Sequence, residues 1–124
     1  MKKIRVIIAD DIADTRRNLK VMLSFSEEIE VVGEAKDGKE VLTLIDKLNP
    51  DVVILDINMP QMDGLNVFKA IVGNYPDVKV IAISFQDDKG YKRILERMGI
   101  SCYLVKPFSI SQLIEAVRKA FGER

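Results

Sequence analysis

The segment "VVILDINMPQMDG" (residues 52–64) joins a run of aliphatic residues to a carboxylate and then to a loop that contains a proline. The run at 52–55 is apolar at every position, which predicts a short strand covered on both faces. Asp56 ends this strand, and a charged side chain at the edge of an apolar strand is costly unless other groups pair with it. We therefore expect residues elsewhere in the chain to supply partners for Asp56.

Apolar runs of this kind occur five times, and segments with the spacing of amphipathic helices separate them. The runs are "IRVIIA" (4–9), "VVGEA" (31–35), "DVVIL" (51–55), "KVIAI" (79–83) and "CYLV" (102–105). Ser109, followed three residues later by Gln112, predicts a capping box at the start of the last helix. The (βα)5 alternation predicts an α/β fold with a doubly wound parallel sheet and right-handed connections.

Length and composition predict one compact domain. The chain has 124 residues, of which 48% are hydrophobic and 31% are charged, a composition typical of globular proteins. We expect a single domain over residues 1–124 with its core at about 4–121. Nineteen basic and nineteen acidic residues cancel, so no net charge attracts the chain to nucleic acid or to an anionic membrane.

Residue types that are rare or absent narrow the chemistry further. The sequence has no histidine, which excludes imidazole metal sites, histidine-based triads and phosphohistidine carriers. Its single cysteine, Cys102, cannot form an internal disulfide, and no apolar run is long enough for a signal peptide or a transmembrane helix. A cytoplasmic location is therefore expected, with chemistry based on carboxylates, hydroxyls and lysine.

Four of the predicted strands run into a polar residue at their carboxyl end. These residues are Asp10 and Asp11 after the first strand, Asp56 after the third, Ser84 after the fourth and Lys106 after the fifth. In an open parallel sheet all carboxyl ends lie at one edge, where ligands of such folds bind, so these side chains are expected to be neighbours. The second strand supplies nothing comparable, which is typical of a strand at the side of the sheet.

The charges of these residues predict a phosphoryl site that contains a divalent cation. Three carboxylates within a few ångströms repel one another unless a cation neutralises them. Lys106 supplies one positive charge, and Mg²⁺ is the hard cation that best fits a set of oxygen ligands. Asp56 is the expected nucleophile toward phosphorus, with Asp10 and Asp11 as metal ligands. Lys106 and the hydroxyl of Ser84 are expected to stabilise the phosphoryl oxygens as charge develops.

The same residues resemble the motifs of a known family. The motifs are "DD" (10–11), "LDINMPQMDG" (55–64), "AIS" (82–84) and "KPF" (106–108). In this order and spacing they resemble the receiver domain of two-component response regulators, over nearly the whole chain. The resemblance implies a flavodoxin-like receiver fold with strand order 2-1-3-4-5 and no output domain in this chain. It also implies that Asp56 accepts a phosphoryl group from a sensor histidine kinase or from a small donor such as acetyl phosphate.

The resemblance implies a magnesium site, with Mn²⁺ as a substitute. The carboxylates of Asp10, Asp11 and Asp56 and the backbone carbonyl of Asn58 would surround the ion. Asn58 would also modulate the site, as would Phe85, which stands where receivers more often carry a small residue. We hypothesise that the Phe85 ring slows attack by water or by an added phosphatase, which would lengthen the phosphorylated state.

The resemblance also implies how phosphorylation would act as a switch. The hydroxyl of Ser84 would move to the phosphoryl group, the ring of Tyr103 would swing inward behind it, and Lys106 would pair with a phosphate oxygen. The face built from the fourth helix, the fifth strand and the fifth helix would then control a partner or effector, and a homodimer could form on phosphorylation. No direct contact of this domain with nucleic acid or membrane is expected. The Lys106–Pro107 peptide bond is often cis in this family.

Other interpretations of the same residues are weighed against the receiver. Asp10 and Asp11 could merely cap the first helix. A phosphatase of the haloacid dehalogenase type needs a second acid where this chain has Asn58, and a flavodoxin-like binding module needs a hydroxyl-rich loop where this chain has two acids. A receiver-like domain that signals without phosphorylation usually lacks part of the acidic set. We therefore expect a switch with only self-directed phosphotransfer and autodephosphorylation, rather than a metabolic enzyme.

Overall fold

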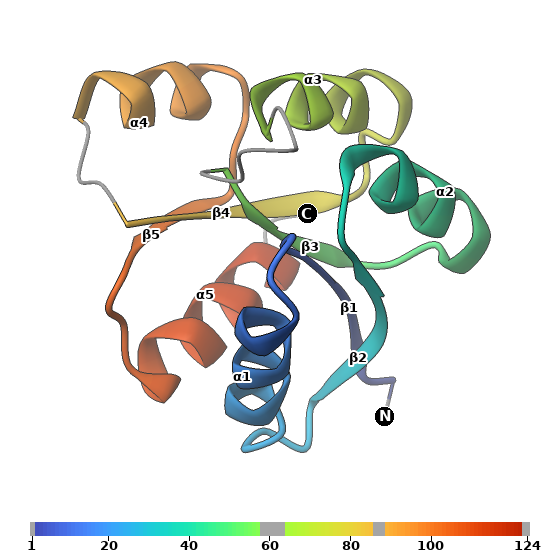
Figure 1. The fold of residues 1–124 in the computed structure, drawn as a ribbon, viewed down its shortest axis with the longest axis vertical. Helices are drawn as coiled ribbons and strands as arrows, with labels where there is room; N and C mark the ends of the chain where they lie inside the picture. The colour runs from blue at the N-terminus through green and yellow to red at the C-terminus, as the bar shows by residue number, and fades with distance from the viewer. Residues whose placement is uncertain (1, 58–63, 86–88, 123–124) are drawn as a thin grey trace.

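The computed structural model describes residues 2–57, 64–85 and 89–122, and in these residues strands and helices alternate. The strands are β1 (Ile4–Ala9), β2 (Ile29–Ala35), β3 (Val52–Asp56), β4 (Lys79–Ser84) and β5 (Cys102–Val105). The helices are α1 (Ala13–Leu23), α2 (Gly38–Leu48), α3 (Gly64–Asn74), α4 (Lys89–Arg97) and α5 (Ile110–Gly122). The predicted (βα)5 order is confirmed (Figure 1).

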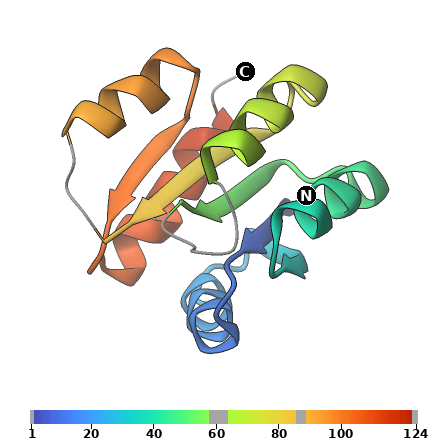
Figure 2. The same ribbon diagram turned by 45° about the horizontal axis from the view of Figure 1, so that its top comes forward.

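The strands form one parallel sheet in the order β2-β1-β3-β4-β5. This order confirms the predicted 2-1-3-4-5, with β3 at the centre and β2 at one side. The arrowheads of β3, β4 and β5 lie at the same edge of the sheet (Figure 2). The carboxyl ends of these three strands therefore lie along one edge of the sheet.

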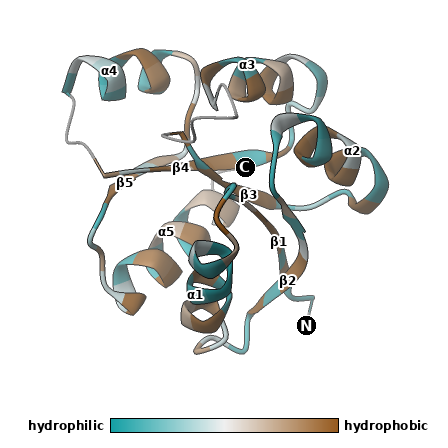
Figure 3. Ribbon diagram, in the orientation of Figure 1, coloured by the Kyte–Doolittle hydropathy of each residue, from teal (hydrophilic) through white to brown (hydrophobic). Residues whose placement is uncertain are grey.

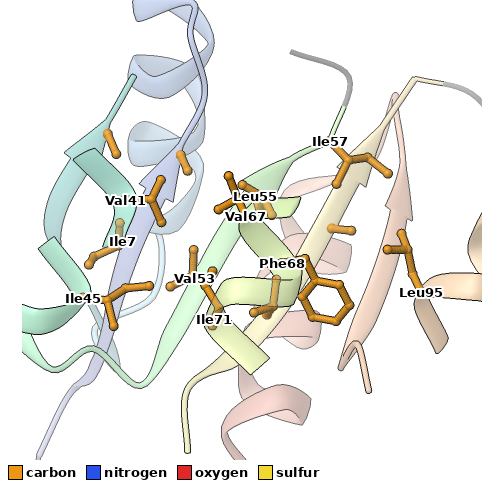
Figure 4. Close-up of a cluster of buried hydrophobic side chains, with 14 residues drawn as sticks. Ile7, Val41, Ile45, Val53, Leu55, Ile57, Val67, Phe68, Ile71 and Leu95 are labelled. Atoms are coloured by element: carbon orange, nitrogen blue, oxygen red, sulfur yellow. The ribbon is translucent and has the colours of Figure 1, made fainter. Parts of the chain in front are cut away.

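Helices cover both faces of the sheet, with α1 and α5 on one face and α2, α3 and α4 on the other (Figure 1). Neighbouring residues of β3 reach opposite layers, because Val53 and Leu55 belong to the core cluster of Figure 4 whereas Val52 and Ile54 belong to the cluster on the other face. The helices carry both hydrophobic and hydrophilic residues (Figure 3). Burial of both faces explains why the strand is apolar at every position.

Specific residues mark the start of α5 and the end of α2. The backbone N–H of Ser109 donates to Oε1 of Gln112 at 2.8 Å, and the backbone N–H of Gln112 donates to Oγ of Ser109 at 3.0 Å. This confirms the predicted capping box at the start of α5. The α2 helix ends at Leu48, and its C-cap, Asn49, has a left-handed φ of 48°; such a residue commonly closes a helix.

The start of α3 lies unusually close to the chain that follows β3. A Cβ atom at Gly64 would be 2.8 Å from the Cα of Ile57, and backbone at that distance cannot move away easily. We expect Gly64→Ala to lower the free energy of unfolding by about 1–3 kcal/mol. Gly73→Ala is the matched control in the same helix, because nothing lies within 4 Å of its added Cβ, and it should raise stability by about 0.5–1 kcal/mol. Urea unfolding checks both, and equal stability of the two variants would contradict the close approach.

Candidate functional site

The end of β3 lies beside the end of β1 at the carboxyl edge of the sheet. Leu55 is paired with Ala9 in the ladder between these strands. The next residues, Asp56 at the last position of β3 and Asp10 just after β1, therefore lie at the same edge. Only 7% of Asp56 and 1% of Asp10 is exposed. The fold thus brings two of the three predicted carboxylates into one buried place.

Lys106 reaches the same place from the end of β5. Its Nζ donates a hydrogen bond to Oδ2 of Asp56 at 3.1 Å, and its backbone N–H donates to the carbonyl oxygen of Ser84 at 2.7 Å. Ser84 ends β4 and is buried. The Lys106–Pro107 peptide bond is cis. Asp56, Ser84 and Lys106 therefore lie together, as the strand-end pattern predicts.

Asp10 is a buried carboxylate whose interactions are incomplete. Its Oδ1 accepts a hydrogen bond from the backbone N–H of Ile12 at 2.9 Å, whereas its Oδ2 has no hydrogen-bond partner among the described residues. Burial raises the pKa of Asp10 from 3.8 to about 7; the bond from Ile12 lowers it, the nearby Asp56 raises it and the charge of Lys106 lowers it. Two neighbouring carboxylates of this kind need a shared proton or a cation between them.

Asp11 and Asn58 are the other two metal ligands that the sequence suggests. Asp11 is partly exposed, and the described residues contain no group of three or more acidic, cysteine or histidine side chains placed to hold a metal ion. Among the residues that the structure describes, Asp11 therefore does not join Asp10 and Asp56 in a closely packed group of three carboxylates; like charges repel, and the third can remain toward solvent. Asn58 lies outside the described residues.

The residues present nevertheless fit a hard cation. Asp10 and Asp56 offer oxygen atoms from two buried carboxylates, and one of these oxygens, Oδ2 of Asp10, has no donor in the described part of the chain. Oxygen ligands with negative charge are those that Mg²⁺ prefers, and Mg²⁺ needs only one or two carboxylates because water and phosphate complete its coordination. Two carboxylates are thus sufficient.

The predicted switch residues Ser84 and Tyr103, and Phe85, which was predicted to modulate the site, lie in or directly after β4 and β5. Ser84 is buried, and the next residue, Phe85, is 60% exposed. Tyr103 of β5 is partly buried and packs against the core cluster on the side of α2, α3 and α4. Its strand neighbour in β4 is Ala82. Tyr103 therefore lies on the α4 side of the sheet, next to the strand that ends in Ser84.

The alternative role of Asp10 and Asp11 as helix caps is contradicted. The N-cap of α1 is Ile12, and no side chain forms a capping hydrogen bond there. The side chain of Asp10 instead binds the N–H of Ile12, which precedes the helix. Capping of α1 therefore does not explain why the Asp10 carboxylate is buried.

Two residues in contact with this region, Arg16 and Glu34, were not predicted from the sequence. Nη1 of Arg16 donates to the backbone carbonyl of Asp10 at 2.6 Å, and Nε of Arg16 donates to Oε1 of Glu34 at 3.3 Å. The second strand, from which nothing was expected, therefore reaches the site through Glu34. The sequence did contain a signal for Glu34, because it is a charged residue just before the end of a mostly apolar strand.

Comparisons with known proteins agree on the family. The model of the response regulator receiver domain matches residues 6–118. The transcriptional regulatory protein DegU of Brevibacillus brevis is 40% identical over 116 residues, which cover 94% of this chain and 49% of DegU. The response regulator protein VraR of Staphylococcus epidermidis is 37% identical over 119 residues, covering 95% of this chain and 56% of VraR. The chain thus spans about half the length of these relatives.

Solved structures give the same answer. The signal receiver domain of NarL from Mycobacterium tuberculosis superposes with a TM-score of 0.92 at 33% identity, and all of both chains is covered. The response regulator domain of CheB from Thermotoga maritima gives 0.90 at 30% identity, covering 99% of each chain. The chain therefore belongs to the receiver domain family of response regulators. These matches do not favour the phosphatase or the flavodoxin-like alternative. Within the described ranges, no helix has the length and hydrophobicity needed to span a bilayer.

The strain between the two buried carboxylates generates a prediction about stability. Asp10→Asn keeps an acceptor for the N–H of Ile12 and places an amide donor beside Asp56. We expect it to raise the free energy of unfolding by about 1–3 kcal/mol in the presence of EDTA. Because the pKa of Asp10 is raised from 3.8 to about 7 in the folded chain, the parent loses stability as the pH rises across that range. The gain of Asp10→Asn should therefore be larger at pH about 8 than at pH about 5.

Urea unfolding at both pH values measures this gain. The matched control is Asp77→Asn, which removes a carboxylate from an exposed position and should show no such pH dependence. A parent that is as stable as Asp10→Asn at the higher pH would show that the two carboxylates do not strain the fold.

Proposed function

We propose that this domain is a phosphorylation-activated switch of a two-component system, and that Asp56 is the phosphoryl acceptor. The observation that carries the proposal is the contact of Asp56 with Lys106 Nζ at 3.1 Å, next to the buried Asp10 carboxylate whose Oδ2 lacks a donor in the described part of the chain. Receiver domains of response regulators act as signalling switches, and residues 1–124 would act as one such unit. The donor would be a sensor histidine kinase or a small phosphodonor, in the cytoplasm.

The chemistry is the transfer of a phosphoryl group to a carboxylate. An oxygen of Asp56 would attack phosphorus, and the bond from phosphorus to the donor nitrogen or oxygen would break with its electron pair going to the donor. Asp10, Asp11 and Asp56, with the carbonyl of Asn58, would hold Mg²⁺, which when bound neutralises charge on the phosphoryl oxygens. Lys106 already lies beside Asp56 and would pair with one of these oxygens.

The new acyl phosphate would change the interactions of Ser84. It adds negative charge and strong acceptors within a preformed site, so the hydroxyl of Ser84 gains a partner. Because the carbonyl of Ser84 accepts a hydrogen bond from the N–H of Lys106, a movement of Ser84 would be transmitted from β4 to β5 and to Tyr103. Phosphorylation would shift the population toward the arrangement in which these contacts form.

The output would pass through the face made by α4, β5 and α5. In α4 the side chain of Leu95 is buried, while that of Ile94 is half exposed. Tyr91 is partly buried and also packs against the core cluster, so Leu95 is the one fully buried side chain among the described residues of α4. A helix with one such side chain can move at lower cost than one with several. The partner would be an effector domain or protein, consistent with relatives that are transcriptional regulators, and the phosphorylated form could dimerise. The zero net charge argues against direct nucleic-acid binding by this domain.

Mass spectrometry tests the proposed acceptor directly. After incubation with acetyl phosphate and Mg²⁺, we expect the parent to gain about 80 Da, the mass of one phosphoryl group. Asp56→Asn should gain nothing, and EDTA should prevent the gain in the parent. The control Asp77→Asn, which changes an exposed aspartate, should be labelled like the parent. Labelling of Asp56→Asn to the parental extent would place the acceptor elsewhere.

The exposed ring beside the site predicts a longer lifetime of the phosphorylated state. Phe85 directly follows Ser84 and is 60% exposed, so it can restrict the approach of water to the phosphoryl group. Phe85→Ala should lose its phosphoryl group roughly threefold faster or more, equivalent to a barrier lower by about 0.6 kcal/mol. Decay of the labelled species over time measures this. Phe25→Ala, which removes an exposed ring from the end of α1, is the control, and an unchanged decay in Phe85→Ala would remove this role.

A further inference from the structure

We propose that Arg16, held by Glu34, is a positioning residue that fixes the loop carrying Asp10 and Asp11 and thereby sets the affinity of the proposed metal site. The inference rests on the proposed function, since the metal site belongs to it. It gives the edge strand β2 a part in the site.

The guanidinium group of Arg16 joins two segments that are otherwise separate. Nη1 donates to the carbonyl oxygen of Asp10 at 2.6 Å, and Nε donates to Oε1 of Glu34 in β2 at 3.3 Å. A planar guanidinium presents its donors in a fixed geometry, so the two bonds orient each other. Only 17% of the Arg16 side chain is exposed, against 73% for its neighbour Arg17. Arg16 is therefore held inside the loop region, whereas Arg17 extends into solvent.

The carbonyl that Arg16 binds lies at the point where the chain leaves the sheet. The N–H of Asp10 still donates to the carbonyl of Ala35 at 3.0 Å, at the end of the pairing between β1 and β2. The carbonyl of Asp10 belongs to the peptide that joins Asp10 to Asp11, the two proposed metal ligands of this loop. Since no side chain caps α1, the bond from Arg16 ties this peptide to the first turns of the helix.

Glu34 is itself fixed from α1. Its Oε1 binds Arg16, and its Oε2 lies 3.7 Å from Nζ of Lys20, one turn further along the helix. A carboxylate held by two cations on the same helix face is a stable anchor for the guanidinium. The connection thus runs from β2 through Glu34 and Arg16 to the backbone of Asp10.

Arg16 acts on the site through position rather than through its charge. Its guanidinium group donates to the backbone carbonyl oxygen of Asp10 and to the carboxylate of Glu34, rather than to the Asp10 carboxylate that would hold the ion. A positive charge near a cation site would weaken binding, so loss of Arg16 would strengthen it if charge dominated. Loss of position has the opposite effect, because partners of metal ligands orient them.

Direct measurement of metal binding separates these cases. Mn²⁺ binding, followed by electron paramagnetic resonance with Mg²⁺ as competitor, should be weakened roughly tenfold in Arg16→Ala. Arg17→Ala is the matched control, because it removes the same charge from the next position of the same helix, and it should bind like the parent. Parental affinity in folded Arg16→Ala, or tighter binding, would overturn the proposal.

Further variants test the two-bond geometry. Arg16→Lys keeps the charge but has one nitrogen in place of the fork, so its affinity should lie between those of the parent and Arg16→Ala. The double variant Arg16→Ala/Glu34→Ala should bind no more weakly than Arg16→Ala, because the two residues act as one unit. A Mn²⁺ affinity of Arg16→Lys equal to that of the parent would show that the two hydrogen bonds of the guanidinium group are not needed. If Arg16→Ala does not fold, the comparison of Arg16→Lys with the parent decides the matter in the same way.

Phosphorylation kinetics provide a readout that a purely structural role would not give. The labelling rate of Arg16→Ala with acetyl phosphate should require a higher Mg²⁺ concentration yet approach the parental rate at saturation. A rate that stays low at saturating Mg²⁺ would contradict a role in metal affinity. Failure of the parent itself to bind Mn²⁺ or to be labelled on Asp56 would instead contradict the proposed function, so the two failures are distinguishable.

Discussion

The site depends on two carboxylates that the fold forces into one buried place. Asp10 and Asp56 follow paired residues of β1 and β3, and both are nearly inaccessible to solvent. Their mutual repulsion and desolvation oppose folding, so such a pair is costly unless positive charge is brought to it. Lys106 provides one such charge through its contact with Asp56. Oδ2 of Asp10, which has no hydrogen-bond partner within the described ranges, is a position where a further positive charge would be stabilising. The arrangement therefore lowers stability, and the proposed binding of a cation and a phosphoryl group would supply a reason for it.

The topology of the sheet explains why the site lies where it does. Both faces of the central strands are covered by helices, so their side chains are apolar and cannot carry chemistry. Polar groups are tolerated only where the strands end, and parallel pairing puts all of those ends at one edge. The order β2-β1-β3-β4-β5 places β3 between β1 and β4. Asp56 is therefore central among the groups at that edge.

Apolar periodicity and strand-end residues were enough to predict the order of elements and the meeting of Asp56 with Lys106, because both follow from patterns that repeat along the chain. The capping box of α5 was predicted from a local motif, the spacing of Ser109 and Gln112. The contact of Arg16 with the carbonyl of Asp10 could not be predicted, because it joins a side chain to an irregular loop whose backbone direction no periodicity specifies. Glu34 was not predicted for a related reason. A strand at the side of the sheet was expected to contribute no residue to the site, yet Glu34 of this strand contacts Arg16 of the neighbouring helix α1.

NMR of the side-chain carboxyl carbons of Asp10 and Asp56 during a Mg²⁺ titration tests most directly whether these two carboxylates share one divalent cation, as we propose. We predict that both resonances move together and saturate with the same apparent affinity, with one ion bound per chain. Resonances that stay fixed at saturating Mg²⁺, or a response of Asp56 without Asp10, would contradict the account.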